Sequence, residues 1–242
     1  MTLEQLNKQR WDLCKIPESN AEAFRKVSDR LKANKPRYDK VSKETGVPWW
    51  FIAVVHYRES NCNWNTQLAQ GDPLNKKSTH VPKGRGPFSS WEEGAVDALV
   101  NCHPYAARNK DWSIGSSLAM LEKYNGLGYF NKGLPSPYLW AGTNQYTRGK
   151  FIADGVFSPT TVDKQLGCAG ILKFLGVGAA SKEVAKTTGI MAAISAAAYS
   201  VYNWGYTHWE YILATALGLG IGTAIYSFVK FRKGKNAKKS VG

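Results

Sequence analysis

The sequence predicts a mainly α-helical fold with one small β-hairpin or long polar loop, followed by a C-terminal hydrophobic helical hairpin. Apolar residues at helical spacing, bracketed by cap residues, recur from Glu4 to Leu175. Residues 61–87 are rich in Asn, Gly, Pro, Lys and Thr and lack this spacing. Two nearly uncharged runs follow Gly178. We therefore divide the chain into a helical extension (1–35), a main domain (36–178) and a hydrophobic hairpin with a basic tail (179–242).

The first half of the chain contains three predicted helical regions. Charged residues with scattered apolar ones from Glu4 to Ala33 indicate one or two amphipathic helices that lie on a larger body. A further helix is expected to end at Gly46, because glycine is the preferred residue after a helix C-terminus. Pro48 is well placed in the first turn of the next helix, "PWWFIAVVHYRES".

Cap residues also delimit the helices that follow the polar stretch. Ser90 and Glu93 have capping-box spacing and open a helix that His103 and Pro104 close. Asp111 is expected to cap a helix that Gly126 terminates. A last helix of this domain is expected to begin at Ser158, with Pro159 in its first turn.

The tail has the features of a membrane hairpin. The run 212–229 has no side chain that is charged at neutral pH and approaches the roughly 18 to 20 residues that cross a bilayer. A shorter, Ala-rich run from Val184 is long enough to span as well, and residues 184–229 would then hold the protein in the membrane. Aromatic residues lie between the runs, and "KFRKGKNAKK" follows the second, so the positive-inside rule places both ends in the cytoplasm. The alternative is a buried helical hairpin in a soluble protein.

Charge and cysteine content limit the possible partners. Lys and Arg exceed Asp and Glu by 14, which favours a polyanion such as nucleic acid, an anionic membrane or an anionic wall polymer. Nucleic acid is the least favoured of these, because no nucleic-acid-binding motif accompanies the scattered basic residues. The four cysteines lack zinc-site spacing, so we expect reduced, mostly buried thiols and neither a metal nor a cofactor. The polar N-terminus does not read as a signal peptide.

Glu59 stands where an apolar helix ends and the polar stretch begins. Ile52, Val55 and His56 precede it by seven, four and three residues, which places Glu59 on the core-facing side of the helix. Loss of hydration raises the pKa of a carboxyl group, and a protonated carboxyl can donate a proton to the leaving oxygen of a glycosidic bond. The alternative is a surface glutamate paired with Arg58.

Two separated motifs carry a resemblance to a known family. "FIAVVHYRESNCNWN" resembles the glutamate-bearing helix of the lysozyme superfamily, and its Arg-Glu-Ser is similar to goose-type lysozymes and soluble lytic transglycosylases. "EKYNGLGY" resembles the Tyr-Asn-Gly segment that lines their glycan cleft. The run 38–175, with "GDPL", "HVPKGRGPF", "WEEGAVDAL", "SPYLW" and "ADGVF", looks like a phage or prophage endolysin. The resemblance covers a little over half the chain and implies a lysozyme-like α+β domain.

The resemblance implies candidate catalytic residues. Glu59 would be the general acid, and Asp72 and Thr79 follow it in the order of the Glu, Asp and Thr of phage lysozymes, although more loosely spaced. Asp72 would stabilise positive charge at the anomeric carbon or orient a water that Thr79 helps to hold. Asp72 is equally suited to form a turn in "QGDP". In that case the N-acetyl group of the substrate, or a water placed elsewhere, would replace it.

The resemblance also implies residues that bind the substrate. Tyr124 and Asn125 would hold a sugar ring and its N-acetyl amide. Trp140, with Tyr138, would stack on sugars or else belong to the core. His80 and His56 would be neighbours of the cleft or core histidines, without companions for a metal.

The function expected from these features is that of a muramidase that hydrolyses the β-1,4 bond between N-acetylmuramic acid and N-acetylglucosamine. Its partners would be peptidoglycan strands and, through residues 184–229, the host inner membrane. The catalytic domain would act in the periplasm after the membrane is breached or the protein reorients, or it would be delivered in a virion. The alternatives are a lytic transglycosylase that forms a 1,6-anhydro product, and a non-catalytic glycan-binding component of a membrane or virion.

Overall fold

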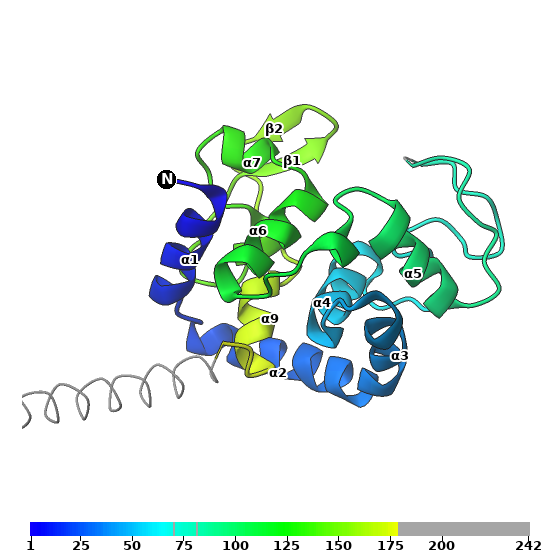
Figure 1. Ribbon diagram of the computed structural model, residues 1–242. Helices are drawn as coiled ribbons and strands as arrows, with labels where there is room; N and C mark the ends of the chain where they lie inside the picture. The colour runs from blue at the N-terminus through cyan, green and yellow to red at the C-terminus, as the bar shows by residue number, and fades with distance from the viewer. Residues whose placement is uncertain (70, 81, 179–242) are drawn as a thin grey trace, which may run out of the picture. The chain divides into compact units, whose positions relative to one another are not determined.

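Helices dominate the computed structural model, which describes residues 1–69, 71–80 and 82–178 (Figure 1). The α-helices are, in chain order, α1 (Leu3–Leu13), α2 (Glu18–Ala33), α3 (Lys35–Thr45), α4 (Trp49–Ser60), α5 (Trp91–Asn101), α6 (Ile114–Asn125), α7 (Gly128–Asn131), α8 (Pro137–Trp140) and α9 (Cys168–Phe174). A short 3₁₀ helix, η1 (Ala106–Arg108), follows α5. Strands β1 (Lys150–Ala153) and β2 (Val156–Ser158) form a two-stranded antiparallel sheet. The mainly α prediction is confirmed for this part of the chain.

Helix α4 is the central helix of the core. All residues from Phe51 to Tyr57 are buried, so the helix is apolar all round, as expected of a helix enclosed by others. It contacts α2, α3, α6 and α9. Gly46 ends α3 with a φ of 75°, and Pro48 directly precedes α4, as the sequence predicted. The enclosure of α4 fixes the position of its C-terminal turn, which carries Glu59.

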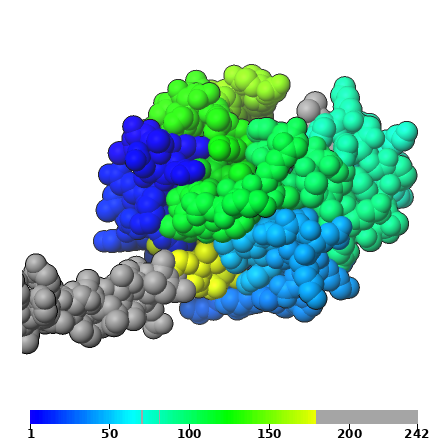
Figure 2. All heavy atoms as spheres, viewed as in Figure 1, coloured from blue at the N-terminus to red at the C-terminus, as the bar shows by residue number. Residues whose placement is uncertain are grey.

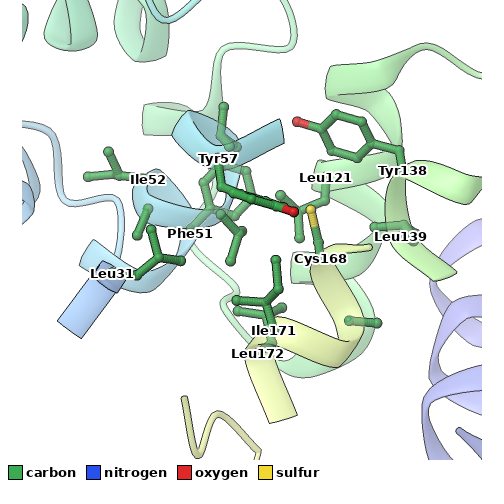
Figure 3. Packing of buried hydrophobic residues seen from close by; sticks show 14 of the residues in the cluster. Leu31, Phe51, Ile52, Tyr57, Leu121, Tyr138, Leu139, Cys168, Ile171 and Leu172 are labelled. Atoms are coloured by element: carbon green, nitrogen blue, oxygen red, sulfur yellow. The ribbon is translucent and has the colours of Figure 1, made fainter. Parts of the chain in front are cut away.

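The core is built from helices that are distant in the sequence. Figure 3 shows side chains from α2, α4, α6, α8 and α9 packed in one cluster. The labelled members of this cluster are Leu31, Phe51, Ile52, Tyr57, Leu121, Tyr138, Leu139, Cys168, Ile171 and Leu172. Helix α8 therefore lies beside the C-terminal half of α4, although the two are far apart along the chain.

The two N-terminal helices are part of this core. Helix α1 begins with a capping box between Thr2 and Gln5 and packs on α6, while α2 packs on α9. Phe24 of α2 is fully buried, and its ring lies so close to Gly170 that a Cβ there would approach Cε1 within 2.2 Å. The helices predicted between Glu4 and Ala33 are present. They belong to the same compact unit, Met1–Ser181, as the rest of the described fold.

The small hairpin lies later in the chain than the resemblance suggested. The described residues between 61 and 87, which leave out 70 and 81, form the long polar loop, with an isolated bridge between Thr66 and Pro73. The hairpin is instead β1–β2, where Ala153 pairs with Val156 and Gly155 has a φ of 71° in the turn. An Asp-Gly pair between apolar strands is a strong hairpin signal. The signal was present in "FIADGVF" and was not recognised as a hairpin.

Two predicted helix starts differ from the structure. The helix expected from Ser158 begins only at Cys168, because Ser158 ends β2 and the segment between them is irregular. Helix α6 begins at Ile114, with Ser113 as its N-cap rather than Asp111. The Asp111 carboxylate instead accepts hydrogen bonds from the backbone and hydroxyl of Ser113. The start of α5 is as predicted, since the Ser90 side chain accepts from the backbone of Glu93.

The hydrophobic hairpin predicted for residues 184–229 lies outside the described residues. Within the described ranges, no helix has both the length and the apolar character needed to cross a bilayer.

Replacement of Phe24 tests whether α2 is integral to the fold. Phe24→Ala removes a fully buried ring, and such changes lower the free energy of unfolding by about 3–5 kcal/mol. We expect a loss of that size in urea unfolding of the full chain. Leu13→Ala removes a side chain of a residue that is 58% exposed, and it serves as the control with a change of at most about 0.5 kcal/mol. Equal, small effects of the two changes would contradict an integral α2.

Candidate active site

Glu59 occupies the last turn of α4. The helix ends at Asn61, which adopts a left-handed conformation with a φ of 51°. The Glu59 side chain is half-buried, and the hydroxyl of Tyr138 donates a hydrogen bond of 2.8 Å to its Oε1 atom. Tyr138 comes from α8, which packs in the core beside α4. The carboxyl group is thus held by a side chain that the core positions.

Burial sets the protonation of Glu59. Loss of hydration raises the pKa of its carboxyl from 4.5 to about 7, although the Tyr138 hydrogen bond and the positive charge of Arg58 oppose the rise. A substantial fraction of the Glu59 side chains is therefore protonated at neutral pH. This is the protonation state that a general acid requires.

Arg58 does not neutralise Glu59. Its guanidinium lies beside Asp163, with 2.9 Å between Nη2 and Oδ2, and it also donates to the backbone carbonyls of Gln165 and Leu166. Among the described residues no ion pair joins Arg58 to Glu59. The expected alternative, a surface glutamate paired with Arg58, does not match this geometry.

Tyr124 brings a second hydroxyl to the site. It lies in the last turn of α6, and its hydroxyl is buried without a hydrogen-bond partner among the described residues. Burial raises the pKa of Tyr124 well above its usual value, and the negative charge of Glu59 adds to this effect. A buried hydroxyl that lacks a protein partner is available to bind a ligand or a water.

A cavity of about 470 Å³ lies next to the side chains that surround Glu59, although Glu59 and Tyr124 are not themselves among its lining residues. Arg58, Tyr138 and Asn125 line it on the side of α4, α8 and α6. The opposite wall comes from α7 and the hairpin and includes Tyr129, Phe151 and Asp154. The rings of Tyr129 and Phe151 meet edge to face, with their centroids 5.0 Å apart. The cavity therefore offers aromatic surface and polar groups together.

The hairpin side of the cavity was not predicted from the sequence. Lys150, Phe151 and Asp154 line the cavity because the turn of β1–β2 folds toward α7. The backbone of Phe151 donates to the Tyr129 hydroxyl at 2.9 Å, which fixes this contact. Recognition of the hairpin would have drawn attention to these residues, but no local pattern links them to Glu59.

Asp72, Thr79 and His80 lie together in the polar loop. The Asp72 carboxylate accepts from the backbone amides of Thr79 and His80, at 2.9 and 3.1 Å, and from the imidazole Nδ1 of His80 at 2.8 Å. The Thr79 hydroxyl is 3.3 Å from the same carboxylate. The backbone amide of His80 is the main cause of the lowered pKa of Asp72, and the His80 side chain and Thr79 add to it.

These contacts give Asp72 a role in bracing the loop. Both of its oxygens are engaged within the loop, and no contact with Glu59 is found among the described residues. The loop nevertheless passes close to the end of α4, because a Cβ on Gly71 would lie 3.9 Å from the carbonyl oxygen of Glu59. The His80 side chain is 74% exposed, so its Nε2 edge is open to solvent. Figure 2 shows this loop, in cyan to teal, at the edge of the molecule.

Asn125 and Trp140 differ in their access to a ligand. Asn125 is exposed on the rim of the cavity, where its amide lies 3.4 Å from the Ser136 hydroxyl. Trp140 is fully buried in the core. Its ring therefore has no face open to a sugar, and the expected stacking role does not fit; the core alternative accounts for it.

His56 belongs to the core rather than to the cavity. It is fully buried between aromatic rings, with Nδ1 3.1 Å from the Tyr38 hydroxyl and Nε2 3.1 Å from the carbonyl oxygen of Asn63. Burial lowers the pKa of His56 to about 4. A neutral imidazole that donates from Nε2 and accepts at Nδ1 satisfies both contacts.

The cysteines are free thiols, and Cys14, Cys102 and Cys168 are buried. In the part of the chain that the structure describes, no three His, Cys, Asp or Glu side chains gather as metal ligands would. Comparisons of the chain with protein-family models, with curated proteins and with solved structures found no match. The chemistry of the site therefore has to be argued from its geometry.

The raised pKa of Glu59 predicts a pH-dependent stability cost. The folded protein holds this proton more tightly than the unfolded chain, so stability falls as the pH rises from about 4.5 to about 7. Glu59→Gln mimics the protonated form and retains an acceptor for Tyr138. We expect it to stabilise the protein by on the order of 2–3 kcal/mol at pH 8 and to have almost no effect below pH 4. Urea unfolding at both pH values measures the difference; a pH-independent difference would contradict a buried, protonated Glu59.

Proposed function

We propose that the protein is a muramidase with a lysozyme-like fold, which hydrolyses the β-1,4 bond between N-acetylmuramic acid and N-acetylglucosamine. The observation that carries the proposal is the Glu59 carboxyl, whose pKa is raised to about 7 by burial and whose neighbours Arg58 and Tyr138 line an aromatic and polar cavity. Departure of the leaving sugar requires a proton on the glycosidic oxygen. A carboxyl that is protonated near neutral pH supplies it.

Two tyrosines assist the acid in this proposal. The Tyr138 hydroxyl donates to Oε1 of Glu59 and so fixes the rotamer of the carboxyl and stabilises the anion left after proton transfer. The unpartnered Tyr124 hydroxyl is enclosed and does not line the cavity, so its part in this proposal is to bind an internal water near the acid. Asn125, on the cavity rim, has an amide suited to the N-acetyl group of an amino sugar.

The cavity supports binding of a sugar ring beside the acid. Tyr129 and Phe151 provide apolar surface, and Gln165, Lys150 and Asp154 provide polar groups around it. Carbohydrate sites need both, because a sugar ring presents apolar C–H faces and a rim of hydroxyl groups. The mixed lining is therefore consistent with a glycan substrate.

A lytic transglycosylase is the second candidate, and one observation favours it. The Asp72 carboxylate is occupied by contacts within the loop, so among the described residues it is not placed to serve as the second carboxylate of a two-carboxylate mechanism. With a single acid, the N-acetyl group of the substrate would stabilise the anomeric carbon. The same acid can then serve either water attack or internal attack that closes a 1,6-anhydro ring.

The setting of the reaction belongs to the same proposal. An excess of 14 basic residues suits the anionic bacterial wall. The resemblance to phage and prophage endolysins suggests host-cell lysis, with residues 184–229 anchoring the protein in the host inner membrane. The catalytic domain would reach peptidoglycan in the periplasm after membrane breach or reorientation, or from a virion.

Glu59→Gln tests the assigned acid. We expect cleavage of purified peptidoglycan to fall by about 10²- to 10⁴-fold, the usual contribution of a general acid, while sedimentation with peptidoglycan is retained. The control is Glu44→Gln on the exposed face of α3, which should cleave at the wild-type rate. Cleavage by Glu59→Gln at the wild-type rate would rule out Glu59 as the acid. Glycan binding without cleavage by the wild-type protein would favour a non-catalytic component.

The products of digestion separate hydrolysis from transglycosylation. Mass spectrometry of wild-type digests should show reducing sugar ends if the protein is a muramidase. Products lighter by one water, with 1,6-anhydro ends, would assign it as a lytic transglycosylase instead.

A further inference from the structure

Arg58 is held away from Glu59 by an enclosed ion pair. The side chains of Arg58 and Asp163 are 6% and 5% exposed, and 2.9 Å separates Nη2 from Oδ2. The second guanidinium nitrogen, Nη1, donates to the carbonyl of Gln165 at 2.9 Å. The guanidinium carbon also lies 4.9 Å from the centre of the Tyr138 ring. One cation thus contacts both Asp163 and the tyrosine that binds Glu59.

The segment around Asp163 is itself fixed in several directions. Lys150 of β1 lies 3.1 Å from the other carboxylate oxygen of Asp163, and the Asp163 amide donates to the Tyr146 hydroxyl at 3.0 Å. The Gln165 side chain donates to the carbonyl of Tyr57 at 2.8 Å. The irregular segment between β2 and α9 is therefore tied both to the hairpin and to the last turn of α4.

A nearly buried guanidinium needs a counter-ion, because an unpaired charge is costly away from water. Tyr138 contacts both the Arg58 guanidinium and the Glu59 carboxyl, so an Arg58 charge without its Asp163 partner would act on Glu59. We propose that Asp163 is a positioning residue that takes Arg58 as its partner, and thereby leaves Glu59 free to act as the acid and keeps the Tyr138 ring in place. This inference rests on the proposed function of Glu59.

The charged and titratable groups around both carboxyls can be named. The groups that interact electrostatically with the Glu59 carboxyl are Arg58, Tyr138, Tyr124 and Cys168, which come from α4, α8, α6 and α9. Burial raises the pKa of the two tyrosines and of the thiol, so all three are neutral between pH 4 and 9. Arg58 is therefore the charged member of this set.

The groups around Asp163 are Arg58, Lys150, Tyr146 and Tyr129. Burial opposes the ionisation of Asp163, but the hydrogen bonds from Arg58 and Lys150 outweigh it and lower the pKa of this carboxyl. Asp163 therefore remains an anion over the whole range in which Glu59 titrates. Its negative charge offsets the positive charge of Arg58 over this whole pH range.

Asp163→Asn should consequently make Glu59 more acidic. The substitution leaves the Arg58 charge uncompensated, and a free cation nearby favours the carboxylate form of Glu59. In the full chain, we expect the alkaline limb of kcat/KM for peptidoglycan cleavage to move toward lower pH by about one unit. Asp163→Glu keeps the negative charge, so its alkaline limb should lie at the wild-type pH. Asp29→Asn on the exposed face of α2 removes an equal charge and should leave the limb unmoved.

A second variant, expected to move the alkaline limb in the opposite direction, distinguishes an electrostatic effect from misfolding. Lys150→Gln removes the more exposed of the two cations at Asp163, since the Lys150 side chain is 38% exposed. Because a positive charge is lost, the alkaline limb should move toward higher pH, by a smaller amount than in Asp163→Asn. An alkaline limb that stays in place in both variants, with only the rate reduced, would overturn the proposal. Direct titration of the Glu59 carboxyl by ¹³C NMR separates this inference from the proposed function. A lower pKa of Glu59 in Asp163→Asn supports the positioning role even if the protein has no cleavage activity. An unchanged pKa of Glu59 overturns it.

Discussion

The site depends on one constraint, the withdrawal of the Glu59 carboxyl from water at the end of an enclosed helix. Helix α4 is buried along seven consecutive residues, so its last turn cannot shift without disturbing the core. Tyr138 reaches the carboxyl from α8 at 2.8 Å, and Tyr124 approaches from α6. Burial keeps a proton on an acid that would lose it in open solvent, and this effect outweighs the Tyr138 hydrogen bond, which favours the anion. The burial that keeps the carboxyl protonated also makes its ionised form destabilise the fold at neutral pH.

Arrangement of the neighbouring charges follows from the same constraint. A cation close to an acid favours the ionised form of that acid. Here the helix directs Arg58 to the segment between β2 and α9, where Asp163 and two backbone carbonyls receive it. The hairpin joins this arrangement through Lys150. The acid, its neighbouring cation and one wall of the cavity are thus mechanically connected, although they come from distant parts of the sequence.

The sequence was sufficient where the determinants are local. Gly46, Ser90 and Gly126 mark helix ends at which they are found, because capping depends on a few adjacent backbone groups. The spacing of apolar residues before Glu59 likewise indicated its core-facing position. Tyr138 and Glu59 are 79 residues apart and Arg58 and Asp163 are 105 residues apart. No periodicity spans such separations, so these contacts required the folded structure.

The close fit of Phe24 against Gly170 has a practical consequence for any shortened version of the protein. A fragment that starts at residue 36 would match the boundary suggested by sequence composition, yet it would uncover the surface of α9 on which α2 rests. The exposed apolar face would favour aggregation. Shortened versions of the protein should therefore retain both N-terminal helices, and fusion partners are better joined ahead of Thr2 than in place of the first two helices.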